Sequence, residues 1–302
     1  MQPIDAHLID AFRNDGVVCV RAVLPPEWVA RTAAAVERVI DEETADLSAM
    51  AHALTGGARD GEPHGRFAAG TDHWHTNPDL FALAASSPLP GVAAALLGSR
   101  TLRLYEDSVL VKEPGTAERT VWHQDLGYFH AEGSQIATTW CPLDAVSADT
   151  GAVRYVRGSH RWGRLFRPNL FVTDEPLPGT EGETVPDVDA TVDPADIVSF
   201  DTEPGDVVVH HAATLHAAGP NLSATARRRA ISVRYCGDDA VIRVRPGAPL
   251  KPHQQHWVDA QPWVADEHPV VWQDRDVQER ASGGGYPAEQ RARPSGPAPK
   301  AP

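Results

Sequence analysis

A succession of short strand-like segments between residues 101 and 236 constrains the fold of this chain most strongly. The segments are rich in β-branched and aromatic residues, and turns with Gly, Pro, Asp or Asn separate them, as is typical of antiparallel strands. They are Thr101–Lys112, Thr120–Asp125, Ile136–Leu143, Ala152–Val156, Asp206–His211 and Arg229–Cys236. Because helical patterns precede these strands, the sequence predicts an α+β protein built around an antiparallel sandwich or barrel.

The first hundred residues carry mainly helical patterns. A short N-terminal helix precedes a β-branched strand at Gly16–Arg21. Pro25 and Pro26 begin a second helix, because proline is tolerated in the first turn of a helix. Residues 51–70 are rich in glycine and charge, which predicts a loop or flap. Residues 88–97 predict a short helix that ends at Gly98.

The composition excludes several classes of protein. Hydrophobic residues make up 42% of the 302 residues and charged residues 23%, as in ordinary globular proteins. The 41 acidic residues exceed the 27 basic ones, so the net charge of −14 predicts no nucleic-acid partner and no membrane partner. No apolar run approaches the roughly 18 residues that span a membrane, and no secretory signal is visible. The scattered Cys19, Cys141 and Cys236 indicate reduced thiols, and together these features predict a cytoplasmic protein.

Two segments stand apart from the predicted core. Residues 173–206 hold eleven acidic residues and no lysine or arginine, which predicts an inserted acidic loop, lid or short helix. Its charge either favours a cationic substrate or only keeps the segment solvated, and the arginines between residues 154 and 167 are expected to offset it. Residues 281–302 are rich in proline and glycine and are predicted to be disordered. We therefore expect one domain over residues 1–280.

Two sequence runs hold candidate metal ligands. In VWHQDLGYF, alternation along a strand places His123 and Asp125 on one face and Gln124 on the other. Farther along, His216 precedes a Gly-Pro-Asn turn and could supply a third ligand. Two histidines and one carboxylate leave open coordination positions, as in non-haem Fe(II) oxygenases. A lone H-x-D triplet is more often a hydrogen-bonded pair, and only the ordered occurrence of all three residues favours a metal site.

A basic side chain that could bind a co-substrate follows these candidate ligands in the sequence. Arg228 lies across the turn from His216. A 2-oxo acid that chelates the metal needs a cation for its far carboxylate, and an arginine forms bidentate, charge-assisted hydrogen bonds with such a group. The alternative is that the three adjacent arginines, residues 227–229, form a solvated face.

The runs WHQDLGYF, GAVRYVRGSH and LHAAGPNLSATARRRAIS resemble the phytanoyl-CoA dioxygenase (PhyH) family of Fe(II)- and 2-oxoglutarate-dependent oxygenases. The resemblance covers about residues 10–240. It implies a double-stranded β-helix (a jelly-roll, cupin-like barrel) with flanking helices. It also implies Fe(II) as cofactor, 2-oxoglutarate and O2 as co-substrates, and His123, Asp125 and His216 as metal ligands.

The resemblance further implies which residues bind the co-substrate. Arg228 matches the family arginine that binds 2-oxoglutarate, and Arg227 is the second choice. Lys112 matches a family lysine on the strand before H-x-D that contacts the co-substrate, and Trp140 would form one wall of the co-substrate pocket. The chain departs from the family at Ala218, where many relatives carry a serine or threonine that helps to bind 2-oxoglutarate. This departure removes about one hydrogen bond from the carboxylate pocket.

The resemblance also implies the reaction. Halogenases that resemble the family have glycine or alanine in place of the carboxylate, so Asp125 favours hydroxylation of an aliphatic carbon, with release of succinate and CO2. Desaturation or ring chemistry stays open, as does the identity of the small-molecule substrate and whether it is bound to CoA or a carrier. The alternatives are a cupin-like metal-dependent isomerase or oxygenase that does not use 2-oxoglutarate, and a non-catalytic relative.

Five side chains are candidates for lining the substrate cavity. Three directly follow H-x-D, one lies in an H-W-H triplet and one on an earlier strand, and they are Tyr128, Phe129, His130, His75 and Tyr105. For His75 the alternative is a solvated loop, and for Tyr105 the favoured alternative is a solvated strand face shared with Arg103 and Asp107. His210 and His211 are placed on the strand of His216, where one must point inward, but their spacing suits neither as a ligand.

Overall fold

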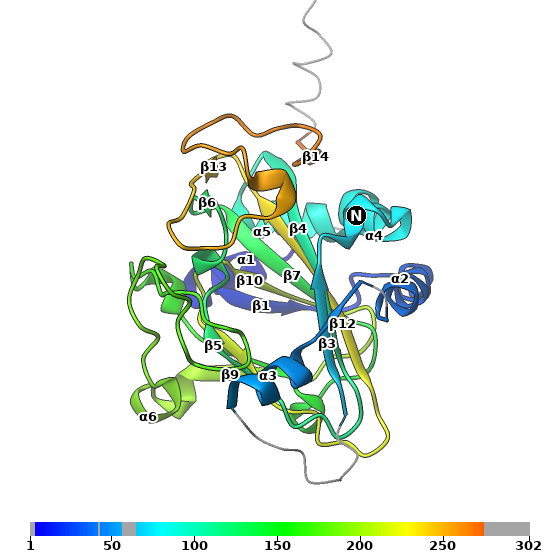
Figure 1. The fold of residues 1–302 in the computed structure, drawn as a ribbon. Helices are drawn as coiled ribbons and strands as arrows, with labels where there is room; N and C mark the ends of the chain where they lie inside the picture. Colours follow the sequence, from blue (N-terminus) through cyan, green and yellow to red (C-terminus); the bar gives the residue numbers. More distant parts are fainter. Residues whose placement is uncertain (1–3, 42, 56–64, 275–302) are drawn as a thin grey trace, which may run out of the picture.

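The structure is a computed structural model that describes residues 4–41, 43–55 and 65–274. Helices in the first hundred residues precede an antiparallel β structure (Figure 1), in agreement with the expected α+β order. The α-helices are α1 (Ala6–Asp15), α2 (Pro26–Val39), α3 (Leu47–Thr55), α4 (Pro78–Ser86), α5 (Leu89–Leu97) and α6 (Val188–Thr191). The 3₁₀ helices are η1 (His73–His75), η2 (Asp125–Gly127), η3 (Ala148–Thr150), η4 (Ser159–Arg161), η5 (Pro194–Asp196) and η6 (Pro252–Gln254).

The largest sheet has eight strands, and its strand pairs are antiparallel. Their order is β1 (Val17–Val20), β10 (Val207–His211), β7 (Ile136–Pro142), β12 (Arg228–Cys236), β4 (Thr101–Lys112), β3 (Phe67–Thr71) and β2 (Ala45–Asp46), and β14 (Val270–Gln273) also pairs with β4. The sheet thus joins strands from both ends of the described chain, so that its centre is formed by β7, β12 and β4.

A second, antiparallel sheet has four strands. Their order is β5 (Thr120–His123), β11 (His216–Ala218), β8 (Val153–Val156) and β9 (Ile197–Ser199). A short pair is formed by β6 (Ala131–Glu132) and β13 (Val241–Ile242). Side chains from both larger sheets line one cavity, so the cavity lies between the two sheets.

Side chains along β12 alternate between the main hydrophobic core and the cavity between the sheets. Ile231 and Val233 are fully buried in the main hydrophobic core, into which α2, α4 and α5 also pack. Arg228, Ser232 and Arg234 point to the opposite face, where they line the cavity between the sheets. Because side chains alternate in a strand, one face builds the core while the other carries polar groups.

The structure departs from the expected local structure in two places. The loop predicted over residues 51–70 is wrong at both ends, where α3 reaches Thr55 and β3 begins at Phe67, and residues 56–64 lie outside the described chain. The helix α4 was not predicted. Its signal is a proline in the first turn after Asn77, whose side chain accepts hydrogen bonds from the backbone of that turn.

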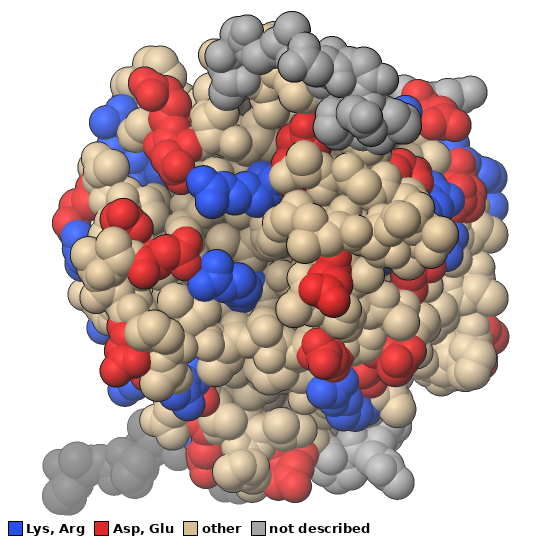
Figure 2. Space-filling view, turned by 90° about the horizontal axis from the view of Figure 1, so that it is seen from below, with Lys and Arg blue, Asp and Glu red and all other residues tan. Residues whose placement is uncertain are grey.

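The segment over residues 173–206 is more than a loop, because it contains α6 and contributes strand β9 to the smaller sheet. Three of its acids pair with arginines from residues 154–164: Asp189 with Arg154, Asp196 with Arg157 and Glu183 with Arg164. Figure 2 shows one face of the molecule, over which acidic and basic side chains are interspersed. The expected offset of charge is therefore found, and the segment presents no unbalanced acidic surface at these positions.

Within the described residues, no single helix is long and apolar enough to cross a membrane. The helices α4 and α5 reach that length and apolarity only as a pair, with a bend of 41° between them. Their leucines, including Leu80, Leu83, Leu89 and Leu96, are buried in the main core. The predicted tail, residues 281–302, lies outside the described residues.

Candidate metal and co-substrate site

His123, Asp125 and His216 come together in the cavity between the sheets. One ligand atom from each residue lies within 4.8 Å of the others. The Nε2 atoms of His123 and His216 are 3.9 and 3.7 Å from Asp125 Oδ1. His123 and His216 are directly paired across β5 and β11, which explains why residues so far apart in sequence meet here.

The turn after β5 presents Asp125 to the two histidines. The strand ends at His123, Gln124 keeps an extended backbone, and Asp125 begins η2. Gln124 points the other way, as alternation predicts, and its side chain donates a hydrogen bond to Ala213 O and accepts one from Phe166 N. The buried Gln124 therefore anchors the turn from behind while its two neighbours face the cavity.

The backbone fixes the tautomer of both histidines. Nδ1 of His123 lies 2.8 Å from Val121 O, and Nδ1 of His216 lies 3.0 Å from Thr214 O. Because a carbonyl oxygen only accepts, each Nδ1 carries the proton and each Nε2 lone pair faces Asp125. Burial lowers the pKa of His123 to about 3 and that of His216 to about 4. Both imidazoles are therefore neutral near pH 7, as metal ligation requires.

The two oxygens of Asp125 have different surroundings. Oδ1 faces the histidines, whereas Oδ2 accepts a 2.5 Å hydrogen bond from Thr138 and lies 3.3 Å from His210 Nε2. Burial alone would raise the pKa of Asp125, but the hydrogen bond from His210 and the nearby Arg234 hold it well below its usual value. Asp125 is thus an anion with one oxygen held by the protein and the other directed at the candidate metal position.

Arg228 lies in the same cavity and is almost fully buried, with 2% of its surface exposed. Its guanidinium carbon is 5.9 Å from the ring of Trp140. Burial lowers the pKa of Arg228 only to about 10, so it stays charged near pH 7. Within the described residues, Arg228 has no ion pair, and its buried Nε has no hydrogen-bond partner. Since a buried unpaired charge is costly, this cation fits a site that receives an anion.

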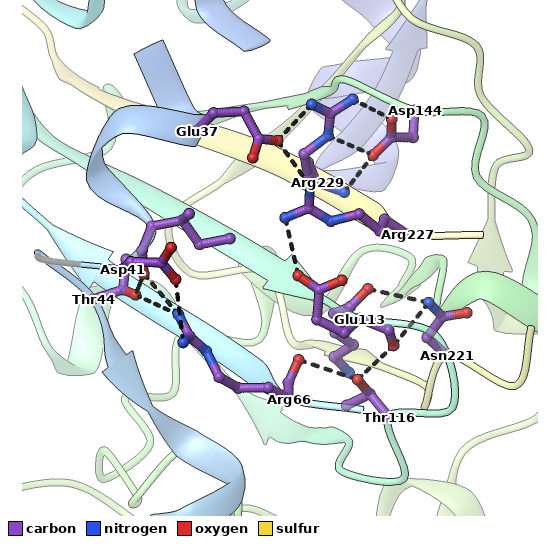
Figure 3. A network of polar contacts seen from close by, with 12 residues as sticks. Glu37, Asp41, Thr44, Arg66, Glu113, Thr116, Asp144, Asn221, Arg227 and Arg229 are labelled. Atoms are coloured by element: carbon purple, nitrogen blue, oxygen red, sulfur yellow. Dashed lines mark hydrogen bonds and ion pairs between the residues drawn. The ribbon is translucent and has the colours of Figure 1, made fainter. Parts of the chain in front are cut away.

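The two arginines beside Arg228 point out of the cavity into a surface network (Figure 3). Arg227 pairs with Glu37 and Glu113, each at 2.9 Å. Arg229 pairs with Asp144 and shares Glu37. Alternation along β12 therefore separates Arg228 from its neighbours, and the structure places Arg228, not Arg227, with the candidate metal ligands.

Lys112 lies opposite Arg228 in the pairing of β4 with β12. Its buried ammonium donates hydrogen bonds to Glu118 O at 2.9 Å and Gly219 O at 2.6 Å. These two carbonyls flank β5 and β11, so Lys112 joins the strands that carry the histidines. Lys112 is not among the residues that line the cavity, and direct contact with a co-substrate stays a prediction.

The cavity itself has a volume of about 40 Å³ and mixed walls. In addition to the residues above, its lining includes Phe67, Leu110, Thr120, Trp140, Val153, Tyr155, Phe171, Ala218 and Ser232. Ligand pockets are usually about 300–1,000 Å³. The cavity is therefore smaller than a typical ligand pocket.

Phe171 is the wall residue with the least usual backbone. Its φ of +69° lies in the left-handed region, which an aromatic residue rarely adopts. Asn169 accepts a hydrogen bond from Phe171 N, and Phe171 O accepts one from Val121 N. The ring consequently lies 4.9 Å from the ring of His123.

The five predicted substrate-lining residues lie outside the lining of this cavity. Tyr128 is the nearest to the site, with its ring 5.7 Å from that of His123 and its hydroxyl hydrogen-bonded to Asn169. Phe129 lies 5.9 Å below the guanidinium of Arg234 and 4.9 Å from Tyr105. These positions put both aromatic rings in a layer beside the site.

The other three candidates, Tyr105, His130 and His75, also lie outside the cavity lining. The Tyr105 hydroxyl accepts a hydrogen bond from His130 N, and His130 Nδ1 accepts one from Arg245 N. The alternative of a solvated face for Tyr105 is wrong, since Tyr105 and Asp107 are buried. His75 belongs to η1 and stacks on Trp74 at 3.6 Å. A substrate contact for any of the five stays a prediction.

Sequence reasoning missed several side chains of the site, among them Thr138, Tyr155 and Phe171. It expected one of His210 and His211 to point inward, and His210 does so. Its placement of His210 on the strand of His216 is wrong, because His210 lies on β10 of the large sheet and His216 on β11 of the smaller one. Alternation along residues 207–211 was the available signal for His210.

Comparisons with known proteins agree with this geometry. Over 182 residues the chain is 30% identical to a probable alpha-ketoglutarate-dependent hypophosphite dioxygenase of Stutzerimonas stutzeri, a match of 54% of this chain and 57% of the relative. It is 27% identical over 228 residues to 1-deoxypentalenic acid 11-beta-hydroxylase of Streptomyces arenae, a match of 72% of this chain and 76% of that protein.

Solved structures extend the similarity to the fold. The non-heme alpha ketoglutarate dependent carbocyclase SnoK from nogalamycin biosynthesis matches with a TM-score of 0.68 and 27% identity, over 89% of this chain and 96% of that one. The epimerase SnoN in complex with Fe3+, alpha ketoglutarate and nogalamycin RO matches with a TM-score of 0.63 and 25% identity, over 88% and 97%. The family model for phytanoyl-CoA dioxygenase (PhyH) matches residues 12–230. Because this match covers most of its length, and a candidate metal-binding triad lies within it, the chain belongs to the phytanoyl-CoA dioxygenase family.

Proposed function

We propose that this chain is an Fe(II)- and 2-oxoglutarate-dependent dioxygenase that hydroxylates an aliphatic carbon of a small molecule and releases succinate and CO2. The observation that carries the proposal is one cavity lined by both the His123–Asp125–His216 triad and the unpaired Arg228. A facial triad leaves positions for a chelating 2-oxo acid and for O2. A buried arginine suits the far carboxylate of that acid.

The residues of this chain divide the work as follows. His123, Asp125 and His216 hold Fe(II), and Arg228 fixes the distal carboxylate of 2-oxoglutarate. The bound iron supplies the activation of O2, with 2-oxoglutarate as the reductant. Trp140 and the apolar walls exclude water, which strengthens the hydrogen bonds of Arg228 to its ligand.

The presence of Asp125 supports hydroxylation within this class. Its carboxylate occupies a position that would have to be free for a halide ligand. A cupin-like enzyme without 2-oxoglutarate has no need for a buried arginine beside the metal-binding residues, and a non-catalytic relative has no need for the intact triad. The relative named 1-deoxypentalenic acid 11-beta-hydroxylase supports the same reaction type.

We also propose that the two facing sheets form a double-stranded β-helix in a single domain over residues 1–280. The antiparallel pairing and the TM-score of 0.68 with SnoK support this architecture. The substrate is proposed to be a small organic molecule, free or carried on CoA or a carrier. The three free cysteines, two of them buried, support a cytoplasmic location.

Formation of succinate tests the proposal. Purified protein with Fe(II), air and 2-oxoglutarate should form succinate slowly even without added substrate, and Asp125→Ala and Arg228→Ala should each lower the rate at least about tenfold. Arg227→Ala is the matched control and should retain the rate, because Arg227 pairs outside the cavity. Equal rates in Arg228→Ala and wild type would contradict the proposed role of Arg228.

A further inference from the structure

We infer that the hydroxyl of Tyr155 donates a hydrogen bond to the distal carboxylate of 2-oxoglutarate and acts beside Arg228 as a positioning residue. This inference rests on the proposed function. It assigns to Tyr155, on β8, the role of the hydroxyl that is missing at Ala218 on the neighbouring strand β11.

Tyr155 is placed deep in the site. It is fully buried and lines the cavity between the sheets. Its ring is stacked on that of His216 at 5.9 Å with an angle of 24°, and it lies 5.2 Å from the ring of His210. These contacts fix the ring, so the hydroxyl has a defined position relative to the metal-binding residues.

The Tyr155 hydroxyl lacks a hydrogen-bond partner among the described residues, although it is shielded from solvent. Buried tyrosine hydroxyls are usually satisfied, and one without a partner calls for an explanation. Tyr235, a buried tyrosine of the main core, shows the usual case, since its hydroxyl donates to Ala84 O at 2.9 Å. Tyr155 and Arg228 are among the residues of the cavity lining that have an unsatisfied buried polar atom, together with Trp140, His210 and Arg234.

The chemistry of the Tyr155 side chain suits it as a hydrogen-bond donor. A tyrosine hydroxyl with its ordinary pKa of about 10 carries its proton near pH 7 and can donate a hydrogen bond. Tyr155 and Arg228 both line this cavity, which makes a shared anionic ligand possible. A guanidinium and a neutral hydroxyl together supply donors to both oxygens of a carboxylate.

The backbone explains why Tyr155 can replace a hydroxyl at position 218. β8 and β11 are paired, with Tyr155 opposite His216 and Val153 opposite Ala218. Ala218 lines the cavity but offers only a methyl group. Tyr155 and Ala218 thus come from paired strands and line the same cavity, and of the two only Tyr155 carries a hydroxyl.

The test compares two ligands on the Fe(II)-loaded protein by anaerobic calorimetry. 2-Oxoglutarate carries the distal carboxylate, and 2-oxobutyrate has the same chelating end without it. Tyr155→Phe removes only the hydroxyl, and it should weaken 2-oxoglutarate binding roughly tenfold or more while leaving 2-oxobutyrate binding within about twofold. Ala218→Ser added to Tyr155→Phe should restore part of the lost affinity.

Three control variants sharpen the result. Tyr235→Phe removes a buried tyrosine hydroxyl outside the cavity and should leave both dissociation constants unchanged. Thr120→Val and Ser232→Ala remove two further hydroxyls of the lining and should not show the ligand-selective loss. An equal loss for both ligands, no loss, or a selective loss only in Thr120→Val or Ser232→Ala would overturn the inference. Failure of wild type to bind 2-oxoglutarate would instead overturn the proposed function, and the inference with it.

Discussion

At the scale of single residues, Asp125 shows how the protein holds a candidate metal ligand in a defined orientation. Thr138 and His210 hold its Oδ2 atom, and the fixed tautomers of His123 and His216 direct two nitrogen lone pairs toward its Oδ1 atom. Partners that orient a ligand in this way usually contribute substantially to metal affinity. Thr138 is the partner that can be changed without disturbing a charge.

Thr138→Val should weaken metal binding about 10- to 100-fold, because Asp125 Oδ2 loses its 2.5 Å hydrogen bond and the carboxylate can rotate. Competition with a chromophoric chelator, using Fe(II) or Co(II), measures the dissociation constant. Thr139→Val is the matched control, since the neighbouring hydroxyl donates to Val233 O within the sheet. If both variants bind the metal equally well, Thr138 does not orient Asp125.

At the scale of elements, the segment that leads into the acidic insert forms the wall of the cavity. Phe171 closes this wall with a left-handed backbone, and Asn169 fixes the conformation through hydrogen bonds to Phe171 N and to Trp122 O. Strain of this kind persists only where surrounding contacts impose it. Phe171 is therefore the wall residue whose substitution tests how well the wall covers the candidate metal ligands.

Phe171→Ala should speed the loss of bound metal to a chelator, because removal of the ring uncovers the side of His123. The rate of Co(II) transfer to excess EDTA measures this access. We expect the rate to increase at least about threefold, because the side chain no longer blocks the path to the metal. Phe81→Ala on α4 is the control, since Phe81 is 38% exposed and remote from the cavity lining. Identical release rates for the three proteins would show that Phe171 does not cover the site.

The C-terminal extension over residues 241–273 contains a histidine that makes the stability of the fold depend on pH. His268 is fully buried among Tyr105, Trp257 and Trp263, and neither ring nitrogen has a hydrogen-bond partner among the described residues. Burial, followed by the charges of His253 and Lys251, lowers the pKa of His268 to about 3. In the unfolded chain a histidine has its ordinary pKa of about 6.5.

The sign of the effect follows from these two values. Between about pH 6.5 and 3 the unfolded chain binds a proton at His268 that the folded chain does not, so the free energy of unfolding falls as the pH is lowered. His268→Phe should remove this contribution, which amounts to about 2 kcal/mol between pH 7 and 5. Urea unfolding of both proteins at the two pH values measures it. Parallel losses of stability in wild type and His268→Phe would contradict the buried, neutral state of His268.

At the scale of the whole molecule, the chain order of the strands creates the site. β5 and β11 carry the histidines in the smaller sheet, while β7, β10 and β12 bring Thr138, His210 and Arg228 from the larger one. Neither sheet holds the complete set. The cavity therefore depends on how the two sheets face each other, and the helices on the outer face of the large sheet stabilise that arrangement through the main core.

Much of this arrangement could be predicted from the sequence, because period-two patterns mark β4, β7, β10 and β12 within one or two residues. The crossing between β10 and β11 could not, since residues 212–215 contain neither glycine nor proline to mark a turn. The left-handed backbone of Phe171 is likewise imposed by tertiary contacts that leave no local signal. Arg228 could be chosen over Arg227 only from the family resemblance, and the alternation of β12 supplies the physical reason.

The binding of 2-oxoglutarate to Arg228 beside the triad is tested most directly by anaerobic titration of the Fe(II)-loaded protein, followed by the visible charge-transfer band of the metal–2-oxoglutarate chelate. Wild type should develop the band and saturate. Arg228→Met should raise the half-saturating concentration at least about tenfold, with partial recovery in Arg228→Lys, because one charge-assisted contact is restored. Superimposable titrations of wild type and Arg228→Met, or iron binding without any band, would contradict the assignment of this cavity to 2-oxoglutarate.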